Sequence, residues 1–475
     1  MSATCPSRPR LADHVQARGH WVDGAFSVIL HDAERGGVLA IGAREWAILL
    51  AADGTRDLAG VRRAADRDGV RADAASIAAF FERLAAHGLV DDDAAEDARP
   101  APSASSGLRD TAARPILAMP DFTLRCDGRG ACCRNYTTVL FSSLESARAR
   151  VLLPDVLDAG ARAELAFFPE RGGDARRGLA VVQVDGACAY LASNGRCSIH
   201  AVAGEAAKPL GCRTFPAQFI DDGEHLRVGP SVECACILAS AAGELAGASS
   251  LLDPSLARRG DLDPAIHVTD LGPVHVACEG RVETLEALRA WTRVLEGAPP
   301  PRDAAAAAWA LAAAIREHGL DPDHARAALR DPPPIDAIAI VPALVALAIR
   351  ATEKAEEDAT WRSSKDLARA SCALLAASCG DLLDGGLGAA LAPPEDPTRE
   401  AFALRATAFA HGFATSPPID AALEDFAVRL VAARAVGARL ARAPHHESLR
   451  EPIAVVWALV RAHGVASYRL RIAEP

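Results

Sequence analysis

Eight of the twelve cysteines of this chain fall between residues 126 and 236, and this clustering constrains the fold more than any other feature of the sequence. An even spread would place about three cysteines in that interval. They occur in four short stretches, FTLRCDGRGACCRNY, DGACAYLASNGRCSIH, KPLGCRTFPAQF and VECACIL. Clustered thiols either form disulfides or hold a metal, and the cellular compartment decides between these two interpretations.

The compartment is inferred from the absence of targeting signals. The amino-terminal residues MSATCPSRPRLADHV contain no apolar core of a signal peptide. The longest apolar run, 337–349, is too short to span a membrane and contains Pro342. We therefore expect a cytoplasmic protein without a membrane partner. Cytoplasmic thiols are kept reduced, so the cluster indicates metal binding or redox chemistry, and the disulfide interpretation would require export.

Composition and charge narrow the class of protein further. The chain has 475 residues, of which 50% are hydrophobic and 24% charged, as expected for two to four globular domains. The formal net charge is −11, and no stripe of lysine and arginine is found. Because nucleic-acid binding requires a basic surface, we expect no nucleic-acid partner.

Residues 1–95 are predicted to form a small domain of their own. Alternation predicts strands at 26–30 and 37–41, and helical spacing predicts a helix from Glu45, a second after Asp57 and a third over 73–87. The phrases VLAIGAREWAILLAADGTRDLAGV and FFERLAAHGLVDD resemble the small winged-helix domain of the PqqD type. That resemblance implies a protein or peptide partner bound along a strand edge. A structural or dimerising winged helix remains the alternative.

A linker and a cysteine-rich domain follow. Residues 96–116 are rich in Pro, Ala and Ser without an apolar period, which predicts a linker. Residues 117–245 are predicted to form an irregular metal-binding domain. Glycines 128 and 130 let the chain curl back after Cys126, and Asn194-Gly195 predicts a hairpin turn between two further cysteines. The candidate metal ligands are Cys126, Cys132, Cys133, Cys188, Cys197, Cys212, Cys234 and Cys236.

The ligand type limits the metal without choosing it. Clustered thiolates select zinc, copper(I) or iron–sulfur clusters. Eight sulfurs exceed the four that a tetrahedral zinc needs, which favours an iron–sulfur cluster, but a zinc site with four of the eight satisfies the same facts. Adjacent side chains usually diverge, so Cys132 and Cys133 are expected to serve different purposes. Which four cysteines bind is left open.

Two motifs, GACCRN after an upstream cysteine and CAYL…NGRCSIH…CRTFP, resemble the YkgJ-type cysteine-cluster family of zinc- or iron-chelating proteins, also described as CxxCxxCC proteins. Within it, the segment 197–236 is most similar to the flagellin lysine-N-methylase branch. The resemblance implies a protein-lysine N-methylase-like enzyme, with S-adenosylmethionine as a further cofactor. The branch has an additional cysteine between the first cysteine and the CC pair, and this chain has none there.

Two other residues beside the cysteines are candidates for the site. Arg213, next to Cys212, is a candidate cofactor-binding residue that would donate to a thiolate or to a bound anion; a surface ion pair is the alternative. His200 is a candidate nitrogen ligand, with an ordinary loop histidine as the alternative. No catalytic residue is identified, and no Rossmann glycine motif, P-loop or radical-SAM cysteine motif is found.

Residues 246–475 are alanine-rich and are predicted to form a helical bundle. The predicted helices are 282–295, 304–318, 321–329, 335–351, 364–378, 398–410, 419–441 and 449–463. Cys278, Cys372 and Cys379 are expected to be buried as small hydrophobic residues, and His445-His446 is placed in a loop. The fold class is therefore α+β and mostly α.

Two functions remain open from the sequence. The first is a metal-binding enzyme that modifies lysine on a recruited protein. The second is a module without enzymatic activity that chelates or senses zinc or iron. Binding of S-adenosylmethionine would distinguish the two, because a chelator has no need of it.

Overall fold

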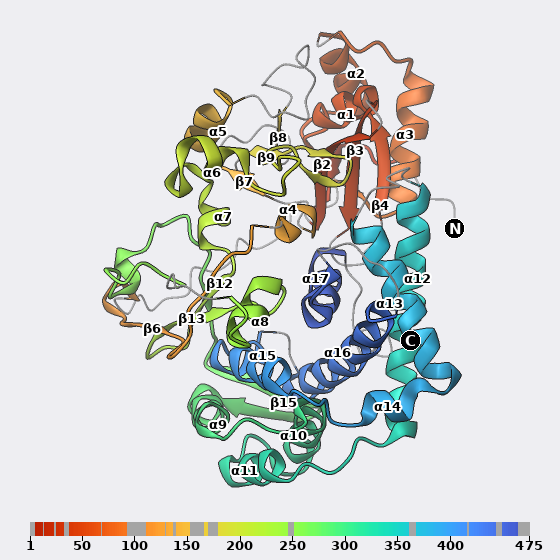
Figure 1. Cartoon of the computed structure of the whole chain (residues 1–475). Helices are drawn as coiled ribbons and strands as arrows, with labels where there is room; N and C mark the ends of the chain where they lie inside the picture. Colours follow the sequence, from red (N-terminus) through yellow and green to blue (C-terminus); the bar gives the residue numbers. More distant parts are fainter. Residues whose placement is uncertain are drawn as a thin grey trace. The chain divides into compact units, whose positions relative to one another are not determined.

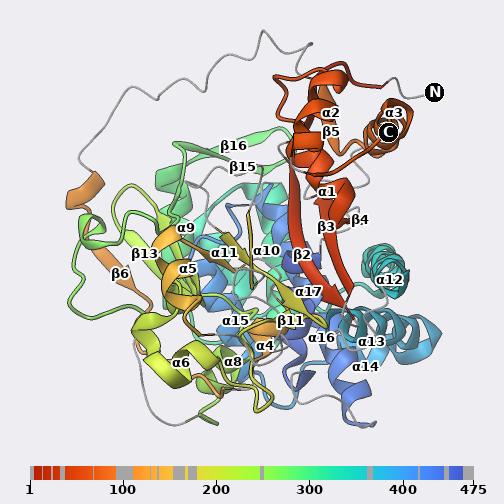
Figure 2. The same ribbon diagram turned by 90° about the horizontal axis from the view of Figure 1, so that it is seen from above.

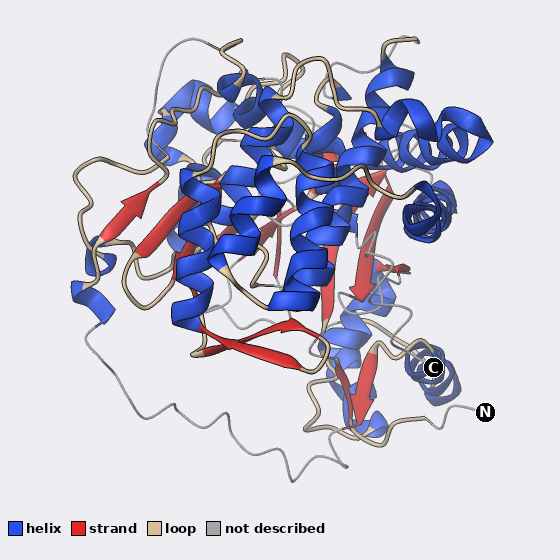
Figure 3. Ribbon diagram, turned by 90° about the horizontal axis from the view of Figure 1, so that it is seen from below, coloured by secondary structure: helices blue, strands red, loops and turns tan. Residues whose placement is uncertain are grey.

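The structure is a computed structural model of the whole chain. It describes residues 5–12, 14–22, 25–32, 38–67, 69–92, 111–128, 130–135, 139–152, 166–169, 179–245, 251–360, 367–415, 418–442 and 449–463. Helices account for 52% and strands for 17% of these residues, so the fold is α+β and mostly α, as predicted (Figure 3). The chain divides into two compact units, unit 1 (1–108, 136–211 and 357–366) and unit 2 (109–135, 212–356 and 367–475).

Unit 1 is built on a five-stranded sheet in the order β11-β10-β2-β3-β4. The central strands β2 (Val15–Val22), β3 (Ala25–Asp32) and β4 (Val38–Gly42) are antiparallel and lie side by side in Figure 2. The predicted pair of strands is thus confirmed, and β2 was missed. On the far side of β2, β10 (Gln183–Val184) adds in parallel and β11 (Ala187–Cys188) follows it.

Three helices of unit 1 confirm the helical spacing of its amino-terminal part. They are α1 (Ala43–Leu50), α2 (Leu58–Arg67) and α3 (Ala74–Ala86). Asp57 accepts a hydrogen bond from the Gly60 amide at 2.7 Å, and Asp73 caps α3 by accepting from the Ser76 amide at 2.8 Å. Strand β5 (Val90–Asp92) then pairs antiparallel with β1 (Pro9–Leu11).

The remainder of unit 1 is a small sheet and two short helices around an aromatic cluster. The elements are β7 (Leu140–Phe141), β8 (Phe167–Pro169), β9 (Leu179–Val181), α5 (Ser143–Ala149) and α6 (Ser198–Ala203), with strand order β7-β9-β8. The rings of Phe141, Phe167 and Tyr190 pack with centroids 5.0–6.3 Å apart. The buried Tyr190 hydroxyl donates to the Ala149 carbonyl at 2.9 Å, so its one polar group is satisfied.

Unit 2 combines a four-stranded sheet, a hairpin and a helical bundle. Its strands are β6 (Ile116–Ala118), β12 (Ala217–Asp221), β13 (Leu226–Pro230) and β14 (Thr269–Asp270) in the order β14-β12-β13-β6, and the hairpin β15 (Val274–Cys278) with β16 (Arg281–Thr284). Its short helices are α4 (Ala131–Asn135), α8 (Ala235–Ala241) and α14 (Leu387–Leu391). Helix α7 (Leu210–Thr214) contains the boundary between the two units, because residues up to 211 belong to unit 1 and residues from 212 belong to unit 2.

The long helices of unit 2 follow the sequence-based ranges closely. They are α9 (Leu285–Gly297), α10 (Ala304–His318), α11 (Pro322–Arg330), α12 (Ala337–Thr360), α13 (Leu367–Asp381), α15 (Thr398–Phe409), α16 (Ile419–Leu440) and α17 (Pro452–His463) (Figure 1). Two predictions were wrong at one end. The helix expected to end at residue 351 continues to Thr360 in α12. Residues 282–284 were assigned to a helix but form part of β16, because Val276 pairs with Val282 and Thr284 caps α9.

Arginine 434 joins three helices at the centre of the bundle. From α16, it donates to Glu400 of α15 at 2.6 Å and to Asp303, the N-cap of α10, at 2.8 Å. It also donates to the carbonyl of Ala390 at 3.0 Å. Alanines with no exposed surface, such as Ala307 and Ala308, line α10 and allow this close packing.

One helical stretch has the length and composition of a membrane span. Ala370–Leu391 has a mean hydropathy of 1.3, and 28% of the 18-residue window is buried. Its buried residues Cys372, Leu375, Cys379 and Leu382 recur on one face and belong to the core of unit 2. Core helices of globular proteins meet the same criteria of length and composition. This stretch was not among the sequence-based expectations.

Several predictions fall on residues outside the described ranges. The loop with His445-His446 is one of them, and so is most of the predicted linker, up to residue 110. The described end of that linker contains a 3-10 turn at Thr111–Ala113 and the start of β6. The predicted cysteine-rich range 117–245 contributes residues to both units.

Strand β13 passes so close to the end of α15 that a side chain at Gly229 is expected to destabilise the fold. A Cβ added at Gly229 would lie 2.8 Å from the Cβ of Ala410, so Gly229→Ala is expected to destabilise unit 2 by about 1–3 kcal/mol. The matched control is Gly297→Ala, where a Cβ meets nothing within 4 Å and a gain of about 0.5–1 kcal/mol is expected. Urea unfolding of both variants measures the two effects; equal stabilities would contradict the packing.

Two histidines with lowered pKa values predict loss of stability in mild acid. Burial, assisted by Arg18, lowers the pKa of His20 to about 4, and burial also lowers the pKa of His411. In the unfolded chain a histidine titrates near pH 6.5. Below that pH the unfolded state binds more protons than the folded state, and this lowers the free energy of unfolding. Stability is therefore full above about pH 6.5 and falls toward pH 4.

For His20 alone the expected loss in unit 1 between pH 7.5 and pH 5 is about 1–2 kcal/mol. Urea unfolding at the two pH values measures it. His20→Gln should flatten the dependence in unit 1, and an unchanged slope in that variant would show that His20 is not responsible.

Candidate metal centre

A loop after β6 carries the first candidate ligands. The side chains of Phe122 and Leu124 pack against the core of unit 2, and the Phe122 ring lies 5.0 Å from that of Phe402 in α15. The loop then turns at Gly128 and Gly130, whose φ values of 72° and 70° lie in the left-handed region that glycine adopts without strain. The predicted reversal of the chain after Cys126 is therefore confirmed.

Helix α8 supplies the opposite wall. Its N-cap is Cys234, and Cys236 lies in its first turn, as the sequence predicted. Ile237 and Leu238 have no exposed surface and anchor the helix in the core. The loop is joined to this helix by the backbone, because the Arg125 amide donates to the Ser240 hydroxyl at 3.2 Å.

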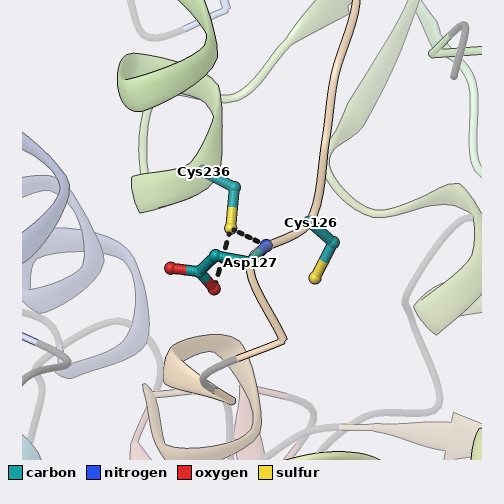
Figure 4. Close-up of side chains that lie close together, drawn as sticks. All are labelled: Cys126, Asp127 and Cys236. Carbon is teal, nitrogen blue, oxygen red and sulfur yellow. Dashed lines mark hydrogen bonds between the residues drawn. The ribbon is translucent and has the colours of Figure 1, made fainter. Parts of the chain in front are cut away.

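Cys126, Asp127 and Cys236 form the candidate metal centre (Figure 4). One sulfur or carboxylate oxygen from each lies within 4.8 Å of the other two, although the segments are 109 residues apart. The Cys236 thiol donates to Asp127 Oδ1 at 3.4 Å and accepts from the Asp127 amide at 3.4 Å. Within the described residues no other group of three histidine, cysteine, aspartate or glutamate side chains is as close.

These separations suit a small tetrahedral metal site. With metal–sulfur and metal–oxygen bonds of about 2.3 and 2.1 Å, zinc would hold a sulfur and an oxygen about 3.6 Å apart, and two sulfurs about 3.8 Å apart. The observed sulfur–oxygen distance of 3.4 Å is close to this value. The three groups can therefore hold a metal ion with small movements of side chains, and a fourth position remains to be filled.

Three more thiols adjoin this centre. The thiol of Cys234 interacts with that of Cys236, and on α4 the thiols of Cys132 and Cys133 interact with each other. Cys126 and Cys132 are close enough to interact electrostatically. Cys132 and Cys133 both lie on α4, and that they serve different purposes stays a prediction. Five of the eight predicted ligands thus form one network of thiols in unit 2.

Crowding raises the pKa of the thiols in this network. The neighbouring Cys236 thiol and then burial hold the pKa of Cys126 well above its usual range, and the Cys133 thiol and burial do the same for Cys132. At Cys236, Cys126 acts to lower the pKa, but the Cys234 thiol and burial outweigh it. A bound cation reverses this balance by stabilising thiolates, so metal binding must release protons.

A buried carboxylate outside the centre, that of Glu451, interacts with Asp127. Glu451 directly precedes α17. Burial raises its pKa, and the negative charges of Glu244 and Asp127 raise it further, whereas Arg399 acts to lower it. Arg399 donates to Glu451 at 3.1 Å and to Glu244 at 2.5 Å. Arg399 therefore offsets the charge of these two carboxylates.

The other predicted site residues are placed elsewhere. Cys188 and Cys197 belong to unit 1, where the predicted Asn194-Gly195 turn is confirmed by the pairing of Leu191 with Cys197. Cys212 lies in the first turn of α7, followed by the exposed Arg213. His200 of α6 is exposed. None of these residues belongs to the close group of Cys126, Asp127 and Cys236.

Both thiols of the unit 1 pair lie near Tyr190. Burial is the main cause that raises the pKa of Tyr190, and Cys188 and Cys197 add to it. All twelve cysteines lie in the described residues, and none forms a disulfide there. Cys278, Cys372 and Cys379 are buried in the core of unit 2, as predicted.

Asp127 is the residue that the sequence-based prediction missed. The signal was present, because it directly follows Cys126 and precedes Gly128 in CDGRG. The sequence analysis considered sulfur and nitrogen ligands and no oxygen donor. Asp127 is exposed and contacts Cys236 through both its backbone and its side chain.

Comparison of the chain with protein-family models, with curated proteins and with solved structures finds no match. What the molecule can do is therefore argued from its own residues. The described part of the chain contains a Cys-Asp-Cys group that could hold a metal, in a cysteine-rich protein of α+β fold.

Proposed function

We propose that this protein binds a metal ion through Cys126, Asp127 and Cys236, and that it is a cysteine-cluster protein of the YkgJ type. One observation carries the proposal. Two sulfurs and a carboxylate from segments 109 residues apart converge within 4.8 Å. Cys234 and Cys132 are the candidates for the fourth ligand, because their thiols adjoin Cys236 and Cys126.

The mixed donor set favours zinc over an iron–sulfur cluster. Iron–sulfur clusters are held by thiolates, whereas zinc accepts sulfur and carboxylate oxygen together. Asp127 therefore moves the balance away from the iron–sulfur interpretation that eight cysteines had favoured. A zinc ion here would fix the loop of Cys126 to the start of α8, and zinc with an open fourth position would also act as a Lewis acid.

For the wider role we propose a lysine-modifying enzyme of the flagellin lysine-N-methylase type, acting in the cytoplasm on a protein partner. The support is the motif resemblance together with the arrangement of unit 1. The strands β2, β3 and β4 followed by three helices fit the PqqD-like pattern, and among the described strands β4 ends the strand order. An open strand edge is where an extended peptide would pair. No nucleic-acid or membrane partner is proposed.

The second candidate is a chelating or sensing module without catalysis. Its support is exposure, because Cys126 and Asp127 both face solvent and the site would exchange metal readily. A structural zinc site, by contrast, is normally closed.

Binding of S-adenosylmethionine to the zinc-loaded protein distinguishes the two. The enzyme hypothesis predicts saturable binding by calorimetry, and adenosine at the same concentration is the control. A lack of S-adenosylmethionine binding, combined with rapid loss of zinc to a chelator, would contradict the enzyme and support the chelating module.

A further inference from the structure

The metal centre contains two thiols that can react with each other. Cys126 and Cys236 contribute two of its three ligand atoms, and their sulfurs lie within 4.8 Å of each other. A disulfide bond is about 2.05 Å long, so the two sulfurs need to approach by at most about 2.7 Å. The same two sulfurs cannot form that bond and serve as thiolate ligands at once.

We propose that Cys126 and Cys236 form a redox switch, in which their oxidation to a disulfide expels the metal ion. The inference rests on the proposed metal site and adds its regulation. It commits to hydrogen peroxide, or a peroxide of the same class, as the oxidant. Reduction by a dithiol would restore the two ligands and the site.

The backbone around Cys126 allows the required movement. Cys126 lies on an exposed loop that turns at two glycines with positive φ, whereas Cys236 is fixed on α8 by the buried Ile237 and Leu238. The amide of Asp127 donates to the Cys236 sulfur at 3.4 Å and so keeps the loop beside the helix. One partner can move and the other is held.

Exposure assigns the chemical roles. The Cys126 sulfur, on the exposed residue, attacks the peroxide O–O bond, becomes a sulfenic acid and releases hydroxide, which takes a proton to form water. The Cys236 sulfur then attacks the Cys126 sulfur and displaces the hydroxyl group, which takes a proton and leaves as a second water. Two electrons pass from the two sulfurs to the peroxide, and the metal leaves as the same divalent cation.

The neighbouring thiol pairs are less suited to this bond. Cys132 and Cys133 are adjacent, and the 3.8 Å between consecutive Cα atoms is below the 4.4–6.8 Å that a disulfide usually spans. Cys234 is the N-cap of α8 and Cys236 lies in its first turn, so both are held by the start of one helix and neither can move far toward the other. Cys126 approaches Cys236 from a separate segment without these restraints.

The experiment uses the full chain loaded with zinc and treated with one equivalent of hydrogen peroxide. A chromogenic chelator follows zinc release, and non-reducing peptide mapping identifies the linked cysteines. We expect one zinc released per disulfide, a Cys126–Cys236 linked peptide, and recovery of zinc binding after treatment with dithiothreitol. Cys379→Ser, which removes a buried thiol of α13, is the matched control and should behave as the unmodified chain.

Other outcomes would overturn the inference. A Cys234–Cys236 or Cys132–Cys133 link, sulfinic acid without a link, or full retention of zinc each contradicts it while leaving the metal site intact. If the chain binds no zinc but still forms the Cys126–Cys236 link, the proposed function fails, and the metal-release part of the switch fails with it. Cys234→Ser should retain the Cys126–Cys236 link, and its loss in that variant would count against the switch.

Discussion

Replacing Asp222 with alanine is expected to lower the free energy of unfolding of unit 2 by about 3–5 kcal/mol, because it removes the fully buried partner of Arg227, leaves that arginine with only the partly exposed Glu296, and leaves two backbone amides unsatisfied. Asp222 lies in the turn between β12 and β13 and has no exposed surface. Arg227 donates to its Oδ2 at 2.6 Å, and the amides of Glu224 and His225 donate to its Oδ1 at 2.9 and 2.7 Å. The carboxylate therefore satisfies several buried donors at once.

The same carboxylate fixes the tautomer of a buried histidine. His411 Nε2 lies 3.3 Å from Asp222 Oδ2, and its Nδ1 lies 3.1 Å from the Thr292 hydroxyl. Burial alone would raise the pKa of Asp222, but hydrogen bonds from His411, the His225 amide and Arg227 hold it well below its usual range. With Asp222 ionised and His411 neutral, Nε2–H donates to the carboxylate and Nδ1 accepts from Thr292.

Urea unfolding followed by circular dichroism measures the loss in Asp222→Ala. Asp253→Ala is the matched control, because Asp253 also accepts from a backbone amide, that of Ser255, but is exposed to solvent. A loss below about 1 kcal/mol in Asp222→Ala would show that the network of Asp222, Arg227 and His411 does not hold the sheet to α9 and α15.

Replacing Cys236 with serine is expected to lower zinc affinity by at least about 100-fold, since it removes a thiolate ligand and disturbs the two hydrogen bonds with Asp127. Asp127→Asn keeps the size of the side chain but removes its charge, so a smaller loss of about 10–100-fold is expected. Competition with a chromogenic chelator at fixed pH measures both affinities.

Cys372→Ser is the matched control for Cys236→Ser, because Cys372 is a fully buried thiol of α13 outside the candidate centre. Zinc affinity should be unchanged in that variant. If Cys236→Ser bound zinc as tightly as the unmodified chain, Cys236 would not be a ligand.

The elements that were predictable are those determined by local sequence. Helix α10 has the predicted bounds because Asp303 caps its first turn and Gly319 ends it, and both signals can be read without tertiary structure. The positive φ of Gly128 and the turn at Asn194-Gly195 are local in the same sense. Burial of Cys278, Cys372 and Cys379 followed from their isolation among apolar residues.

What was not predictable depends on contacts between distant segments. Residues 282–284 carry a helical pattern and yet pair with 274–276, since the strand partner outweighs local propensity. The parallel pairing of β10 with β2 joins residues 183–184 to 20–21, and no local sequence pattern predicts it. For the same reason the sequence identified eight candidate thiols but could not predict that Cys126 lies beside Cys236. An oxygen ligand such as Asp127 has no distinctive spacing in the sequence.

Metal content tests the central claim most directly. The full chain is purified anaerobically, and zinc, iron and acid-labile sulfide are measured per chain alongside the same analysis of the double variant Cys126→Ser, Cys236→Ser. We expect a colourless protein with zinc near one per chain, little iron or sulfide, and loss of the zinc in the double variant. A chain that holds no metal and takes up none on titration, or a double variant that retains its zinc, would contradict the assignment of this centre.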